Sequence, residues 1–126
     1  MSKGRNEGGE AVTETVIIVP TLLLLIMVVI QFGLWYHAQH VVQAAAQEGA
    51  RAARAEGATA DDGLERAMTF VAQVGGQSVH EPEVTSQRSS DGVTVRVTGE
   101  APAVVPGLRL GVSAAAVSPV EEFTAP

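Results

Sequence analysis

Glu14 is the residue that most needs a chemical explanation, because it is a carboxylate placed directly before a long apolar run. Ionisable groups at a membrane-spanning segment are costly and usually have a partner. In one interpretation, Glu14 is solvated in the headgroup region and favoured by the positive end of a helix dipole. In the other, it neutralises a positive charge that another molecule supplies.

Gly9 adds a second feature, because a small residue at this distance from the membrane edge is a candidate cleavage site for a cytoplasmic-side membrane peptidase. Cleavage after Gly9 would give Glu10 a new terminal amine in a low-dielectric environment, and Glu14 of a neighbouring subunit could neutralise it. The arrangement is similar to a type IV pilin-like leader. Gly9, Glu10 and Glu14 therefore form a candidate leader-processing motif.

The element that must position this motif is an uncharged run, Val16 to Ile30. With its flanks, it predicts a transmembrane helix over residues 11–36, since ~20 helical residues cross a hydrocarbon core. Trp35 and Tyr36 end this segment, and such amphipathic aromatics are expected as anchors at the far interface. A cleaved secretory signal is a poorer fit, because the nearest small-residue site, 44–46, lies far beyond the apolar run.

Basic residues set the predicted orientation. Lys3 and Arg5 precede the span, which favours a cytoplasmic location for residues 1–10, the leader. Residues 37–120 are then an extracytoplasmic domain, followed by a C-terminal tail at 121–126. The predicted location is a bacterial cell membrane, crossed once.

The helix is expected to continue outward, from about Ala11 to about Glu56, because the segment after the span is rich in alanine and free of proline. Gly57 is a candidate C-cap. A second helix is expected to begin at an N-cap among Thr59, Asp61 and Asp62 and to end at Gly75-Gly76. Its predicted buried face consists of Leu64, Ala67, Met68, Val71 and Val74.

A change to period two marks a strand, in which Val93, Val95 and Val97 alternate with polar residues. Residues 79–87 are expected to pair with it as a hairpin, with Pro82 restricting that strand to an edge or to a late start. Residues 101–111 are predicted to form a loop and 112–118 a third strand. The fold class is therefore α+β, with a long transmembrane helix, a second short helix and a small antiparallel sheet.

Composition excludes several functions. The chain has no cysteine and a net charge of −6, which argues against disulfides, thiolate chemistry and nucleic-acid binding. We find no catalytic motif, cofactor motif or small-molecule substrate site, so an enzyme is not expected. His37 and His40 could share a metal, but two imidazoles alone make a poor site, and we predict none.

Small residues recur every four positions after the span, in one row of Ala45, Gly49 and Ala53 and a parallel row of Ala46 and Ala50. Such rows allow two helices to approach closely. They are candidate helix-packing residues, either against a helix of another chain or against the chain's own domain.

The chain resembles the TadE-like family of pilus assembly proteins. The resemblance is carried by Gly9, Glu14, Pro20 followed by four leucines, Gln31-Phe32-Gly33 and the segment 44–53. It implies a pilin-like fold and a minor pseudopilin that helps to assemble a tight-adherence (Flp, type IV) pilus. Its implied partners are the lipid bilayer, sibling pilin-like proteins, the tight-adherence secretion apparatus and a prepilin peptidase.

Two alternatives belong to other classes. One is an uncleaved bitopic protein that scaffolds a different cell-envelope complex. The other is an envelope module that binds a small ligand, although no residue pattern marks a pocket for it.

Overall fold

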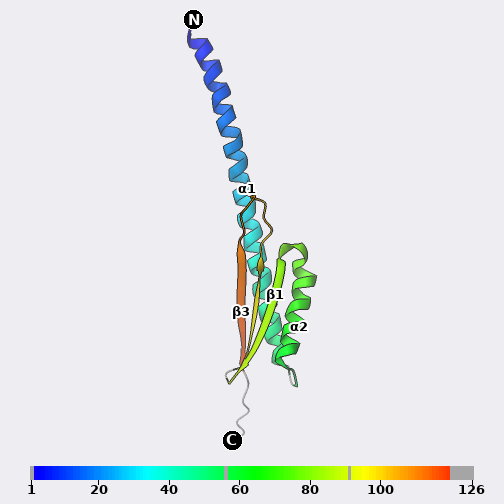
Figure 1. Cartoon of the computed structure of the whole chain (residues 1–126). Helices are drawn as coiled ribbons and strands as arrows, with labels where there is room; N and C mark the ends of the chain where they lie inside the picture. Colours follow the sequence, from blue (N-terminus) through cyan, green and yellow to red (C-terminus); the bar gives the residue numbers. More distant parts are fainter. Residues whose placement is uncertain (1, 56, 91, 120–126) are drawn as a thin grey trace.

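The protein consists of one long helix with a small α+β domain on its C-terminal half (Figure 1). The computed structural model describes residues 2–55, 57–90 and 92–119, so the predicted tail at 121–126 lies outside the described residues. The predicted α+β class, with a second short helix and a small antiparallel sheet, is confirmed. The N-terminal half of the long helix projects beyond the domain.

Helix α1 spans Ser2–Ala53, 52 residues, with Pro20 inside it. At 1.5 Å per residue it is about 78 Å long. It begins earlier than predicted and ends before Glu56, which lies outside the described residues. The chain leaves the helix through tight turns, with the amide of Arg54 donating to the carbonyls of Ala50 and Arg51 at 3.2 Å. Gly57 has the positive φ of +78° expected of a cap, but it lies four residues past the last helical residue.

Helix α2, Ala60–Phe70, starts at Thr59, one of the three predicted N-cap candidates. The Asp62 amide donates to the Thr59 hydroxyl at 3.3 Å, and the Thr59 amide donates to the Asp62 carboxylate at 2.7 Å, forming a capping box. The helix then widens into one π turn, Val71–Gly75, and tightens into a 3₁₀ turn, Gly76–Ser78.

The buried face of α2 differs from the prediction. Of the five predicted residues, Ala67 and Val71 are buried and Leu64 is partly buried, whereas Met68 and Val74 are exposed. Gly63 and Gly75 are buried as well. The face that α2 turns toward α1 is set by the close approach of the two helices, because only small side chains permit that approach. Side-chain volume therefore decides which face is buried here.

The sheet has the order β1-β2-β3 and is antiparallel throughout. Its strands are β1 His80–Ser89, β2 Gly92–Glu100 and β3 Gly111–Pro119. Pro82 is on an edge strand as predicted, where the register shifts between His80 and Glu83. Residues 101–110, which connect β2 to β3, contain no helix or strand, as expected.

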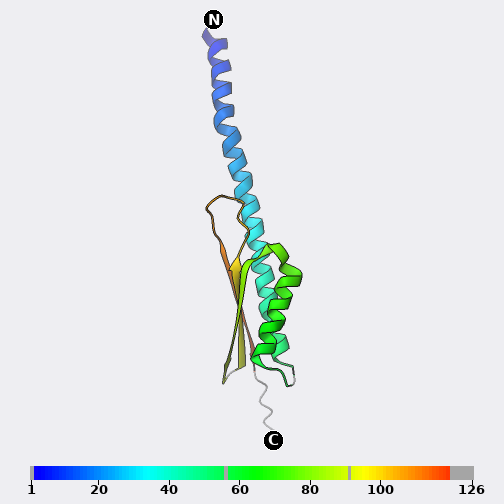
Figure 2. The ribbon, with the colours of Figure 1, turned by 45° about the vertical axis from the view of Figure 1, so that its right-hand side comes forward.

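One face of the sheet packs on α1 and α2 (Figure 2). No helix of the described part of the chain lies on the other face. The predicted inward residues Val93, Val95 and Val97 are buried in the core. The helical side of the core consists mainly of alanine and valine, so the layers lie close together. This domain packs on the C-terminal half of α1, and the N-terminal half projects beyond it (Figure 1).

Candidate functional site

The leader-processing motif lies on the projecting half of α1. Gly9 and Glu14 are exposed, and a Cβ atom on Gly9 would meet nothing within 4 Å. Glu10 lies in the helix, but its side chain is outside the described part of the structure. The Thr13 hydroxyl donates to the Gly9 carbonyl at 2.9 Å, as is common for threonine inside helices. Gly9 and Glu14 are thus accessible on the described helix.

The next segment of α1 exposes large apolar side chains on all sides. Within the described residues, one helix segment, Ala11–Ala53, is long and apolar enough to cross a membrane, and its most apolar part is almost entirely exposed. The exposed large apolar residues before Gln31 are Val12, Val16, Ile17, Ile18, Val19, Leu22, Leu23, Leu24, Leu25, Ile26, Val28, Val29 and Ile30. A helix that is apolar all round needs an apolar environment, and a bilayer provides one.

Gln31 marks the point where the domain begins on α1. This side chain is only 2% exposed. Its amide nitrogen donates to the carbonyl of Pro102 at 2.9 Å, and its oxygen accepts from the amides of Val104 and Val105 at 2.8 and 3.3 Å. One glutamine therefore satisfies three backbone groups of the β2–β3 loop.

The predicted interface anchors Trp35 and Tyr36 have different environments. Trp35 is half-buried against the core, and its indole nitrogen donates to the carbonyl of Gly111 at 3.2 Å. Tyr36 is exposed and contacts His40 edge-to-face, with ring centroids 4.4 Å apart. Tyr36 therefore has the exposed side chain expected of an interfacial anchor, whereas Trp35 also bonds to the start of β3.

Gln39 lies on the same side of α1 as Gln31 and Trp35. Its amide donates to the Ser113 carbonyl at 2.8 Å and its oxygen accepts from the Ser113 amide at 3.3 Å. These are the outward backbone groups of an edge strand, which would otherwise be open to pairing with another strand. Gln31, Trp35 and Gln39, at four-residue spacing, thus attach the loop and β3 to α1.

The small-residue rows are used within the chain. Ala45, Ala46 and Ala50 are buried in the domain core. Gly49 faces Gly63 of α2, where an added Cβ would lie 2.7 Å from the Gly63 carbonyl oxygen. Ala53 is partly buried and also close to Gly63. The rows therefore bring α1 against the chain's own α2 and sheet, and a contact of these residues with a helix of another chain stays a prediction.

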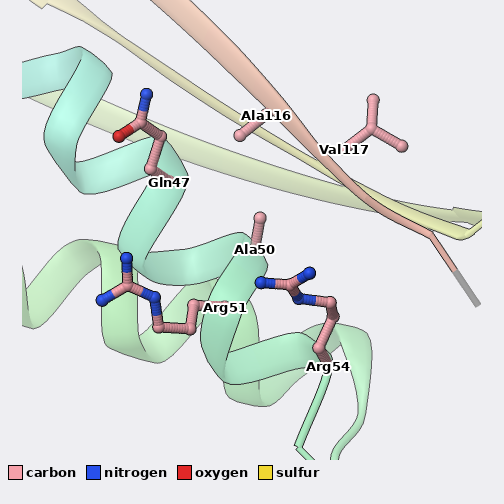
Figure 3. A pocket seen from close by; sticks show the side chains of 6 residues that line it. All are labelled: Gln47, Ala50, Arg51, Arg54, Ala116 and Val117. Atoms are coloured by element: carbon pink, nitrogen blue, oxygen red, sulfur yellow. The ribbon is translucent and has the colours of Figure 1, made fainter.

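Charged groups near the end of α1 connect the two helices. Glu48 accepts from Arg51 on the same helix and from Arg66 on α2, both at 3.3 Å. Arg51 and Arg54 also line a shallow pocket of about 230 Å³ across from Ala116 and Val117 of β3 (Figure 3). The pocket is open and has little apolar lining, unlike the enclosed sites that hold small molecules.

His37 and His40, the pair considered for a metal, are both exposed on α1. Among the described residues there is no group of three or more His, Asp or Glu side chains that could hold an ion.

Sequence reasoning missed the contacts made by Gln31 and Gln39, and the glycines of α2. A signal for the glutamines was present, because they are polar residues spaced by eight on a helix that is otherwise apolar or alanine-rich. Gly63 and Gly75 fit the same small-residue spacing as Ala67, but a pattern of hydrophobicity does not select glycine.

Comparison with protein families gives a match to TadE-like protein over residues 9–51. The predicted resemblance is confirmed over this segment, which contains the leader motif, the apolar half of α1 and most of its packed half. No curated protein and no solved structure matches the chain.

Proposed function

We propose that this chain, with its TadE-like segment at 9–51, is a minor pseudopilin that helps to assemble a tight-adherence pilus. The TadE-like match supports a role in pilus assembly and at the membrane. The observation that carries the finer proposal is one unbroken helix whose first half is an exposed apolar rod and whose second half is the spine of a folded domain. The role is structural, and no catalytic step is assigned to it.

In this proposal residues 11–30 cross the bacterial cell membrane. Lys3 and Arg5 remain in the cytoplasm, because basic residues flanking a span are retained on that side. The domain that begins at Gln31 then faces outward. Its rigid attachment to α1 would transmit the position of the helix directly to the domain.

The leader motif supplies the assembly step. A prepilin peptidase would cut after Gly9, which is accessible on the projecting helix. The new amine at Glu10 would then pair with the Glu14 carboxylate of a neighbouring subunit. In this chain Glu14 is exposed and therefore available for such a pair. The side-by-side helices would place both charges in the low-dielectric membrane, where a pair is retained because an isolated charge is costly.

Processing is tested by the intact mass of the chain purified from membranes of its native host. The expected mass is that of a chain beginning at Glu10, and Gly9→Leu should leave the chain at full length. Detection of only the full-length mass in the unmodified protein would contradict processing.

The role of Glu14 is tested by counting pili in a host that carries Glu14→Gln. We expect a loss of roughly tenfold or more, because breaking a desolvated ion pair costs several kcal/mol. Glu7→Gln is the matched control, since Glu7 lies before the cut and should be neutral. If Gly9→Leu and Glu14→Gln both leave pili unchanged, the uncleaved scaffold for another envelope complex becomes the better account.

A further inference from the structure

The loop between β2 and β3 has an unusual composition for an exposed connection. Residues 101–110 read APAVVPGLRL, and Val104 and Leu108 are 37% and 36% exposed. In both ribbon views this loop lies at the end of the sheet that faces the projecting half of α1 (Figures 1 and 2). The opposite end of the sheet carries the polar β1–β2 turn at Ser90.

The loop is fixed at one height along α1. Gln31 bonds to Pro102, Val104 and Val105, with its shortest contact, 2.8 Å, to the Val104 amide. On the other side of the loop, the amide of Ala101 donates to the carbonyl of Leu110 at 2.9 Å and closes its base. The apolar tip is therefore held beside Gln31 and does not swing freely.

This height coincides with the expected edge of a bilayer. Residues 11–30 of α1 make up 20 residues, about 30 Å of helix, which equals the thickness of a hydrocarbon core. Gln31 would then lie just outside it. Phe32, 63% exposed, is the next residue of α1, and Tyr36 lies about 6 Å further along the helix, so both fall in the interfacial region that aromatic side chains favour.

We infer that loop 101–110 rests in the outer interfacial layer of the lipid bilayer, as a second membrane contact beside the transmembrane helix. Val104 and Leu108 would bury their side chains at the boundary of headgroups and acyl chains. The exposed Arg109 would lie among lipid phosphates. The inference rests on the proposed insertion of residues 11–30.

A lipid surface fits better than a protein partner because loop 101–110 is bonded to Gln31, the residue that directly follows the exposed apolar segment of α1. The loop and the helix would enter the same apolar phase, and no separate groove is required. Two contacts, one through the helix and one through the loop, would also restrict the tilt and rotation of the domain over the membrane.

The test uses the full chain in phosphatidylcholine–phosphatidylglycerol vesicles, with an environment-sensitive fluorophore on single cysteines. The chain has no native cysteine, so each label is unique. The sites are Val104→Cys and Leu108→Cys on the loop. Leu23→Cys reports the span, and Ser90→Cys is a matched loop control at the far end of the sheet. Quenching is measured with lipids that carry a nitroxide near the headgroup end of the acyl chain, for the labels at 104, 108 and 90, or near its methyl end, for the labels at 23 and 90.

We expect the labels at 104, 108 and 23 to be quenched at least twofold more than the label at 90. If 23 is quenched while 104 and 108 behave like 90, the loop inference is wrong and the span stands. If 23 is not quenched, both fail. A blue-shifted label at 104 or 108 without lipid quenching would indicate contact with another protein chain and would also overturn the inference.

Discussion

The two halves of α1 form one continuous helix but differ in the size of the side chains that they present. From Val12 to Ile30 the helix presents leucine, isoleucine and valine on every side. From Ala38 to Ala53 it presents alanine, glycine and valine to a sheet and a second helix. Lipid chains adapt to any shape, whereas a neighbouring backbone can approach closely only over small side chains. Side-chain volume, more than helix propensity, therefore separates the segment for lipid from the segment for protein.

The largest effect is expected from adding volume where the two helices meet. Gly49→Val would place a Cβ 2.7 Å from the Gly63 carbonyl oxygen and 3.0 Å from the Ala67 Cβ. We expect the free energy of unfolding of the domain to fall by about 3 kcal/mol or more. The measurement is urea unfolding in detergent, followed by the fluorescence of Trp35, which packs against the core.

Gly33→Ala is the matched control for that change, because a Cβ at Gly33 meets nothing within 4 Å. It should leave stability unchanged or slightly higher, since alanine is the better helix former. Equal losses for both variants would show that helix flexibility, and not close packing, explains the glycines.

Removing volume from the core tests the same contrast from the other side. Val95, on β2, is fully buried against Gly49 of α1 and Gly63 of α2. Val95→Ala should lower the free energy of unfolding by about 2 kcal/mol. Leu23→Ala removes more atoms from the projecting half of α1 and should not change domain unfolding. A comparable loss for Leu23→Ala would mean that the apolar half also packs on the domain.

Gln31 lies at the boundary between the two halves, and its replacement should loosen the loop that it holds. Gln31→Ala leaves the Val104 amide and the Pro102 carbonyl without their partner, at a cost of about 1–2 kcal/mol. Hydrogen exchange at the amides of Val104 and Val105 should accelerate by roughly tenfold. Gln43→Ala, on the exposed surface of α1, should leave both rates unchanged.

The smallest effect is expected from the charges that connect α1 to α2. Glu48→Gln removes both ion pairs, but the Arg51 side chain is 70% exposed and the Arg66 side chain 41% exposed, so the loss should be below about 1 kcal/mol and should shrink in high salt. Glu65→Gln, on the exposed face of α2, is the control. A salt-independent loss well above this value would contradict a minor role for these charges.

Local patterns were enough to predict much of the fold. The alternation of Val93, Val95 and Val97 predicted a strand with one buried face. Thr59 was among the residues predicted to start α2, because each of these signals lies within a few residues. Pro82 predicted an edge strand for the same reason. These features depend on backbone chemistry that neighbouring residues determine.

Contacts between distant residues were not predicted. Met68 and Val74 were assigned to the buried face of α2 because they are apolar, yet the face is set by Gly63 against Gly49 on another helix. Gln31 bonds to backbone groups more than 70 residues away. The small-residue rows indicated a close helix contact, but their spacing alone did not indicate whether the partner was the same chain.

The central claim is that α1 passes from lipid to its own protein core at Gln31. It is tested most directly by a nitroxide scan of single cysteines from residue 16 to residue 46 in vesicles, measuring collision with oxygen. We predict high oxygen accessibility on all sides of the helix up to residue 30, followed by a periodic pattern in which Ala38, Val42 and Ala45 are protected. Protected positions recurring every three or four residues before Gln31, or a segment accessible only to water-soluble reagents, would contradict this account.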